Sequence, residues 1–93
     1  MTALKRPQFL VVDDEVAMVR LLELLLRPLG DVTKVYSVPE ATEALGRGLK
    51  ADCIITDVCM PEASGLELLD IVRKKYPEIP VVVMTAFSSV PQA

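Results

Sequence analysis

The sequence contains no histidine, no tryptophan and only two cysteines among its 93 residues. Zinc sites in proteins usually combine cysteine with histidine, so the usual zinc sites are excluded. Cys53 falls in a predicted strand and Cys59 in a predicted loop. We interpret both as free thiols that are buried or incidental, with no metal or disulfide role.

The chain also lacks an excess of positive charge and any long hydrophobic run. Ten basic residues stand against thirteen acidic ones, which gives a net charge of −3 and no basic field for direct nucleic-acid binding. The apolar run 9–12 is too short for a signal peptide and meets acids at once, and no segment reaches the length of a membrane span. We therefore expect a cytoplasmic location, without membrane or direct nucleic-acid contacts.

What the sequence does contain is apolar side chains in short, regular patterns. Hydrophobic residues make up 52% of the chain and the mean hydropathy is +0.41, which excludes intrinsic disorder and suits one small domain. Short apolar runs alternate with amphipathic helical patterns, which is typical of a doubly wound parallel sheet. The predicted strands are 8–12, 32–36, 53–56 and 79–84, and the predicted helices are 15–27, 37–46, 64–75 and one that opens at 88. We predict an α/β fold with a doubly wound parallel sheet, and if this sheet is flavodoxin-like its strand order is 2-1-3-4.

Two of these elements carry further expectations. After its first residue, the helix 15–27 has charges only at Arg20, Glu23 and Arg27, so its wide apolar surface predicts burial against more than the sheet. The strand 32–36 is more polar than the others, which indicates a sheet edge.

Three acids follow two of the predicted strands. Asp13 and Asp14 follow the first strand and Asp57 follows the third, so all three would share one crevice if these strands are neighbours. Carboxylates that close repel each other unless a cation lies among them, and a hard divalent ion such as Mg²⁺ prefers oxygen ligands. Such a site suits a phosphoryl group, with a carboxylate as covalent acceptor and the hydroxyl of Thr85 as a hydrogen-bond partner.

The combined motifs resemble a known family. Asp13-Asp14, then Asp57-x-x-Met60-Pro61-x-x-x-Gly65, then the run VVVMTA at 81–86 is similar to the receiver domain of two-component response regulators. The resemblance implies that Asp57 accepts a phosphoryl group from a sensor histidine kinase. It also implies that Asp13, Asp14, Asp57 and the backbone carbonyl of Cys59 hold Mg²⁺, and that Thr85 is the switch hydroxyl. The segment MTAFS at 84–88 is more similar to the corresponding segment of receivers attached to ATPase-type transcription activators. Such proteins carry a C-terminal output domain.

The sequence departs from this family at its C-terminal end. Receivers continue through a full fourth helix, a fifth strand with a phosphoryl-binding lysine and a fifth helix, and no lysine here follows a predicted strand. We therefore expect residues 1–93 to form an incomplete receiver that ends at the start of the fourth helix. The strand 79–84 would then be an uncharged edge, which predicts a homo-oligomer through the fourth strand.

Alternatives to a phosphoacceptor remain open at this point. Asp14 could simply cap the first helix. The chain could be a protein interaction module in which phosphorylation has become irrelevant, since the lysine is missing. A haloacid-dehalogenase-like phosphatase would need an Asp-x-Asp pattern after the first strand, whereas Asp13 and Asp14 are adjacent. In the main interpretation, a phosphoacceptor receiver, the chain is not an enzyme.

Overall fold

The computed structural model describes residues 6–60 and 64–84 and shows a four-stranded parallel sheet in the order β2-β1-β3-β4. The predicted α/β fold and strand order are confirmed. The elements in chain order are β1 (Gln8–Val12), α1 (Val16–Leu26), β2 (Asp31–Val35), α2 (Val38–Gly46), β3 (Cys53–Asp57), α3 (Gly65–Lys75) and β4 (Val81–Met84). Thr85 and the helix expected from residue 88 lie outside the described residues.

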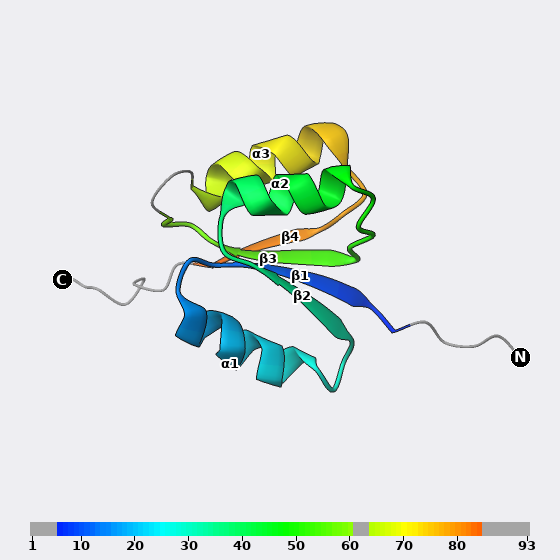
Figure 1. Ribbon diagram of the computed structural model, residues 1–93. Coiled ribbons are helices and arrows are strands. Elements are labelled where there is room, and N and C mark those ends of the chain that lie inside the picture. Colours follow the sequence, from blue (N-terminus) through cyan, green and yellow to red (C-terminus); the bar gives the residue numbers. More distant parts are fainter. Residues whose placement is uncertain (1–5, 61–63, 85–93) are drawn as a thin grey trace, which may run out of the picture.

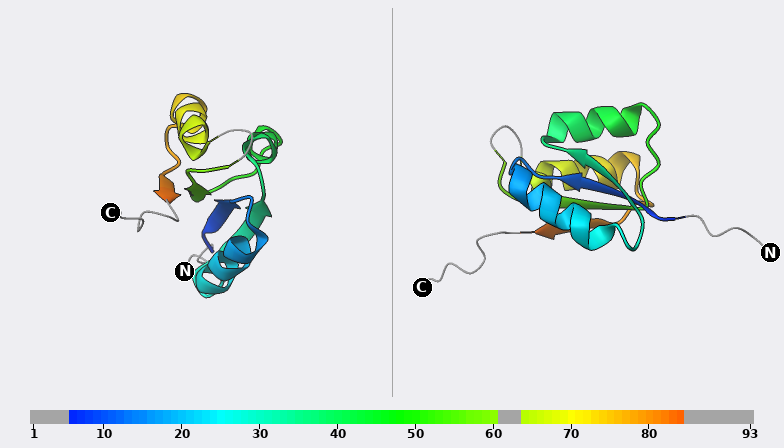
Figure 2. Two further views of the ribbon diagram at one scale, coloured as in Figure 1. Left: turned by 90° about the vertical axis from the view of Figure 1, so that its left-hand side faces the viewer. Right: turned by 60° about the horizontal axis from the view of Figure 1, so that its bottom comes forward.

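The helices divide unequally between the two faces of the sheet. Figures 1 and 2 show α2 and α3 side by side on one face and α1 alone on the other. The main core lies on the side of α2 and α3, where Leu10 and Ile54 of the central strands meet Leu68 and Val72 of α3. No helix in the described part of the chain is long and apolar enough to cross a membrane.

The prediction that α1 is buried against more than the sheet is wrong for the residues described. Val19 is the helix's fully buried residue, whereas Leu21, Leu24 and Leu25 are 49%, 65% and 61% exposed. The expected charged stripe on the solvent side of α1 is also incomplete, because Glu23 forms an ion pair at 3.2 Å with Lys34 of β2. An apolar pattern shows which residues can be buried, but no second helix covers them on this face among the described elements.

Local signals set most element boundaries. Ser37 and Ser64 cap α2 and α3, since their hydroxyl oxygens accept from the backbone N–H of Glu40 at 3.2 Å and Glu67 at 3.3 Å. β2 lies at a sheet edge, as predicted, although it starts and ends one residue earlier. β4 begins two residues later than predicted because the N–H of Ile79 is taken by Tyr76 in the turn after α3, and Pro80 has no N–H.

Gly65 fixes how closely α3 approaches the end of β3. Its N–H donates to the carbonyl of Val58 at 3.0 Å, and a Cβ at this position would overlap the carbonyl oxygen of Asp57. The side chain of Thr56 lies only 3.1 Å from the same point. A side chain at residue 65 would therefore force α3 and the strand apart.

We expect Gly65→Ala to lower the free energy of unfolding by roughly 1–3 kcal/mol, because the added methyl group meets backbone that cannot move freely. Gly46→Ala is the matched control. Nothing lies within 4 Å of a Cβ at Gly46, which is helical, so alanine should be neutral or stabilise by up to about 1 kcal/mol. Urea denaturation of both variants measures the difference, and equal effects would contradict the tight contact at Gly65.

Candidate functional site

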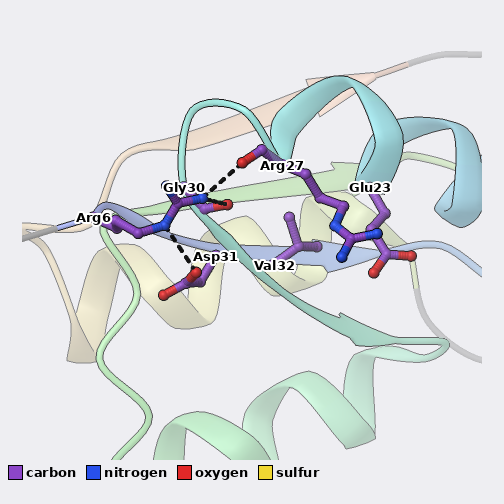
Figure 3. A pocket seen from close by; sticks show the side chains of 6 residues that line it. All are labelled: Arg6, Glu23, Arg27, Gly30, Asp31 and Val32. Atoms are coloured by element: carbon purple, nitrogen blue, oxygen red, sulfur yellow. Dashed lines mark hydrogen bonds and ion pairs between the residues drawn. The ribbon is translucent and has the colours of Figure 1, made fainter.

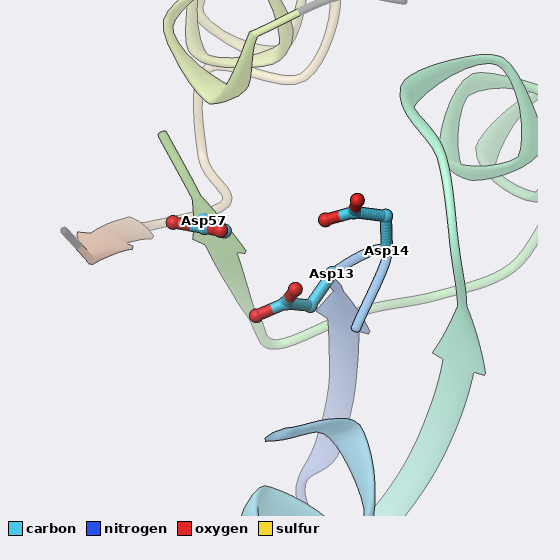
Figure 4. Close-up of side chains that lie close together, drawn as sticks. All are labelled: Asp13, Asp14 and Asp57. Atoms are coloured by element: carbon cyan, nitrogen blue, oxygen red, sulfur yellow. The ribbon is translucent and has the colours of Figure 1, made fainter. Parts of the chain in front are cut away.

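The fold brings the three predicted acids together at one edge of the sheet. β1 and β3 are parallel neighbours, so Asp13 and Asp14 after β1 lie beside Asp57 at the end of β3 (Figure 4). One carboxylate oxygen from each residue lies within 4.8 Å of the others. The geometry therefore places three acids in one small volume, as the sequence predicted.

Two of these acids are nearly removed from solvent. Asp13 is 3% exposed and Asp57 is 8% exposed, whereas Asp14 is exposed. Burial raises the pKa of Asp13 above its ordinary value of 3.8, and the carboxylates of Asp57 and Asp14 add to the rise. A hydrogen bond at 2.9 Å from the N–H of Glu15 to Asp13 Oδ1 opposes it. Asp13 therefore resists ionisation in the absence of a cation.

The helix-cap interpretation of Asp14 is wrong. The residue at the N-cap position of α1 is Glu15, and no side chain makes the capping hydrogen bond there. The acid that binds local backbone is Asp13. An aspartate that accepts from the N–H two residues later forms an Asx-turn, and this preference of aspartate is the local signal that favours Asp13 in this role. Asp14 is thus free of a helix-capping role and keeps its carboxylate beside the other two.

The donor set fits a small hard cation. All three contributing atoms are carboxylate oxygens, and two oxygens on opposite sides of one Mg²⁺ are roughly 4.2 Å apart, which agrees with a cluster contained within 4.8 Å. Among the ion pairs formed by the described residues, none involves these acids, since Lys34 pairs with Glu23 and Lys74 with Asp70. The residues present therefore suit Mg²⁺ with waters or phosphate oxygens completing its shell.

A depression opens beside Asp14, the exposed member of the three acids. It has a volume of about 510 Å³ and is lined by Asp14, Val58, Cys59, Met60 and Ser64. Cys59 is exposed and its thiol is free, so the position is open to solvent. Val58 was not singled out from the sequence, because its contribution is backbone: its N–H donates to Met84 at 2.9 Å and its carbonyl accepts from Gly65. No side-chain signal marks such a role.

A second depression, of about 370 Å³, lies at the opposite end of the sheet (Figure 3). There the guanidinium of Arg6 donates to Asp31 Oδ1 at 3.1 Å and to the carbonyls of Arg27 at 2.7 Å and Gly30 at 3.0 Å. Hydrogen bonds from Gln8 and Arg6 hold the pKa of Asp31 below its ordinary value. Arg6 therefore closes the end of α1, and this depression has a structural explanation.

The family comparison covers almost the whole chain. The model of the response regulator receiver domain family matches residues 9–93. The response regulator protein PilR of Pseudomonas aeruginosa is 36% identical over 91 residues, which is 97% of this chain and 20% of PilR. The transcriptional regulatory protein ZraR of Salmonella typhimurium is 40% identical over 85 residues, 90% of this chain and 19% of ZraR. The chain thus spans about a fifth of the length of these curated relatives.

Solved structures give the same result. The response regulator TrrA of Thermotoga maritima, crystallised with Mg²⁺ and BeF, has a TM-score of 0.82 and 33% identity, covering 89% of this chain and 72% of that one. A structure of the histidine kinase ThkA in complex with TrrA matches with a TM-score of 0.80 and 31% identity, covering 94% of this chain and 75% of that one. The match to the receiver domain family over residues 9–93 contradicts the alternative of a haloacid-dehalogenase-like phosphatase.

We expect Asp13→Asn to stabilise the metal-free protein at neutral pH by roughly 1 kcal/mol, because it removes a buried charge beside two others and keeps the oxygen that accepts from Glu15. The raised pKa of Asp13 sets the pH dependence. The gain should shrink as the pH falls through this pKa and vanish below the ordinary value of 3.8, where Asp13 is protonated in both states. Denaturation in EDTA across this range measures it, and a gain independent of pH would contradict the repulsion.

We also expect Mg²⁺ to bind weakly and raise the melting temperature, while Asp13→Asn and Asp14→Asn each reduce the affinity by removing negative charge that the ion offsets. Asp70→Asn is the control, because Asp70 lies on the exposed surface of α3 and pairs with Lys74. Magnesium titrations followed by NMR measure the affinities. If neither site variant changes the titration, the acids do not form the metal site.

Proposed function

The chain belongs to the response regulator receiver domain family, and on this premise we propose that it accepts a phosphoryl group from a sensor histidine kinase onto Asp57. The observation that carries the proposal is the position of Asp57, a nearly buried carboxylate at a strand end within 4.8 Å of two further acids. Mg²⁺ would be held by Asp13, Asp14, Asp57 and the backbone carbonyl of Cys59. When bound, it supplies positive charge that offsets the acids and the phosphoryl oxygens.

The proposed reaction needs little from the protein beyond positioning. An oxygen of Asp57 attacks the phosphorus of the phosphohistidine, the phosphorus–nitrogen bond breaks and the histidine of the kinase departs as the leaving group. Burial keeps Asp57 short of water, and the N–H of Glu15 holds Asp13 in a fixed orientation beside it. The hydroxyl of Thr85 is the proposed switch contact. Since the acceptor is itself modified, the chain is a phosphoacceptor and not an enzyme.

The proposed partners follow from the relatives. A histidine kinase is in complex with TrrA in one similar structure, and ZraR is named a transcriptional regulatory protein. We propose a kinase of this type, a C-terminal output domain in transcription regulation and a cytoplasmic location, without direct nucleic-acid or membrane contacts by this segment. A second copy of the chain is a further proposed partner, and it would meet the first along β4.

We expect beryllofluoride with Mg²⁺ to shift the NMR signals of residues around Asp57 in the unmodified chain. It should cause no such shifts in Asp57→Asn, because the side-chain amide of asparagine lacks the negatively charged oxygen that binds the group. Asp70→Asn should respond like the unmodified chain, since Asp70 is on the surface of α3. Uptake that survives Asp57→Asn would contradict the assignment. No uptake by a folded, unmodified chain would favour the interaction-module alternative.

A further inference from the structure

Thr56 is a polar residue at a position where the strand is otherwise built for the core. It is fully buried, and Ile54, two residues earlier on the same face of β3, belongs to the main core. Valine has nearly the same shape and would fill this position without burying a hydroxyl group. A buried hydroxyl needs a hydrogen-bond partner within the protein, so the partner of Thr56 indicates what the hydroxyl does.

The partner of this hydroxyl is the main chain of Asp57. Thr56 Oγ1 donates to the carbonyl oxygen of Asp57 at 3.1 Å. That carbonyl lies beyond the last pair of the β1–β3 ladder, which joins Val12 to Thr56. The first residue of α3 approaches the same place, since a Cβ at Gly65 would lie 3.1 Å from Thr56 Oγ1. The hydroxyl therefore binds the strand end at the point where the ladder to β1 has stopped.

The peptide group between Asp57 and Val58 is held at both of its ends. Its carbonyl accepts from Thr56, and its N–H donates to the carbonyl of Met84 at 2.9 Å. The next peptide group is held at its carbonyl, which accepts from the N–H of Gly65 at 3.0 Å. Because peptide groups are planar, these bonds fix the backbone on the carboxyl side of Asp57 and the direction in which the loop leaves the strand.

We propose that Thr56 is a positioning residue for the acceptor site. Its hydroxyl fixes the main chain of Asp57, and through it the Asp57 carboxylate and the carbonyl of Cys59. This inference rests on the proposed role of Asp57 and adds a residue that acts through it. The carboxylates of Asp13, Asp14 and Asp57 lie within 4.8 Å of one another, so a small displacement of one decides whether a single Mg²⁺ can contact all three. Groups that orient metal ligands in this way contribute roughly tenfold or more to metal affinity.

Two substitutions separate this role from packing, because they remove different atoms. Thr56→Val keeps the branched shape but has no hydroxyl, whereas Thr56→Ser keeps the hydroxyl and lacks the methyl group. For packing alone, Thr56→Ser is the more disruptive change, since it leaves a small cavity. We expect the opposite order at the site. Thr56→Val should weaken Mg²⁺ binding and beryllofluoride uptake roughly tenfold, and Thr56→Ser should behave nearly like the unmodified chain.

Thr33→Val is the matched control for these titrations. Thr33 lies in the middle of the edge strand β2, so the same exchange of a hydroxyl for a methyl group there should leave both titrations unchanged.

Amide hydrogen exchange in the metal-free protein tests the same role without a ligand. The amide of Val58 should exchange several-fold faster in Thr56→Val than in the unmodified chain or in Thr56→Ser, because its peptide group has lost the bond at the other end. The amide of Ile54 donates to Pro80 at 2.9 Å in the same pair of strands and is the internal reference, which should change less.

Three results would overturn the proposal. They are unchanged exchange of Val58 relative to Ile54 in Thr56→Val, unchanged Mg²⁺ binding by that variant, and a loss in Thr56→Ser as large as in Thr56→Val. Thr56→Ser decides alone if Thr56→Val does not fold, since weakened Mg²⁺ binding by Thr56→Ser contradicts the role of the hydroxyl.

A failure of the phosphoacceptor proposal gives a different result. The unmodified chain then takes up no beryllofluoride, while Mg²⁺ affinity and the exchange of Val58 still distinguish Thr56→Val from Thr56→Ser.

Discussion

Parallel pairing of β1 with β3 is the constraint on which the site depends. The two strands are far apart in the sequence, yet their pairing places both carboxyl ends at one edge of the sheet. Asp13, Asp14 and Asp57 come together for this reason alone, without any long loop to position them. The core beneath them, built around Leu10 and Ile54, therefore determines the spacing of the acids. The packing of β1 and β3 thus sets the geometry of the candidate site.

The three acids also destabilise the fold. Two of them are nearly buried, and no ion pair among the described residues offsets their charge. Clusters of this kind lower the stability of an empty protein and are retained where a bound ion uses them. The capped helices and the apolar core must supply that stability elsewhere. In the metal-free protein, repulsion among these acids thus destabilises the edge of the sheet where they meet.

The alternation of strands and helices and the polar edge strand β2 were predictable from local periodicity, whereas the strand order, and with it the acids' shared crevice, was predicted from the flavodoxin-like order that the family resemblance implies. Ser37 and Ser64 were predictable as caps for the same local reason. The exposure of α1 was not, since an apolar helix records what can be buried and not which partner lies nearby. The roles of Glu15 and Val58 were also missed, because both act through backbone groups that carry no side-chain signature.

The close packing of Gly65 has a mechanical consequence. The first residue of α3 rests on the carbonyl of Asp57, accepts no side chain at this point and is tied by its N–H to Val58. There is no free space between the carbonyl of Asp57 and the first residue of α3. A displacement of the Asp57 backbone toward α3 would therefore be transmitted directly to the first turn of the helix.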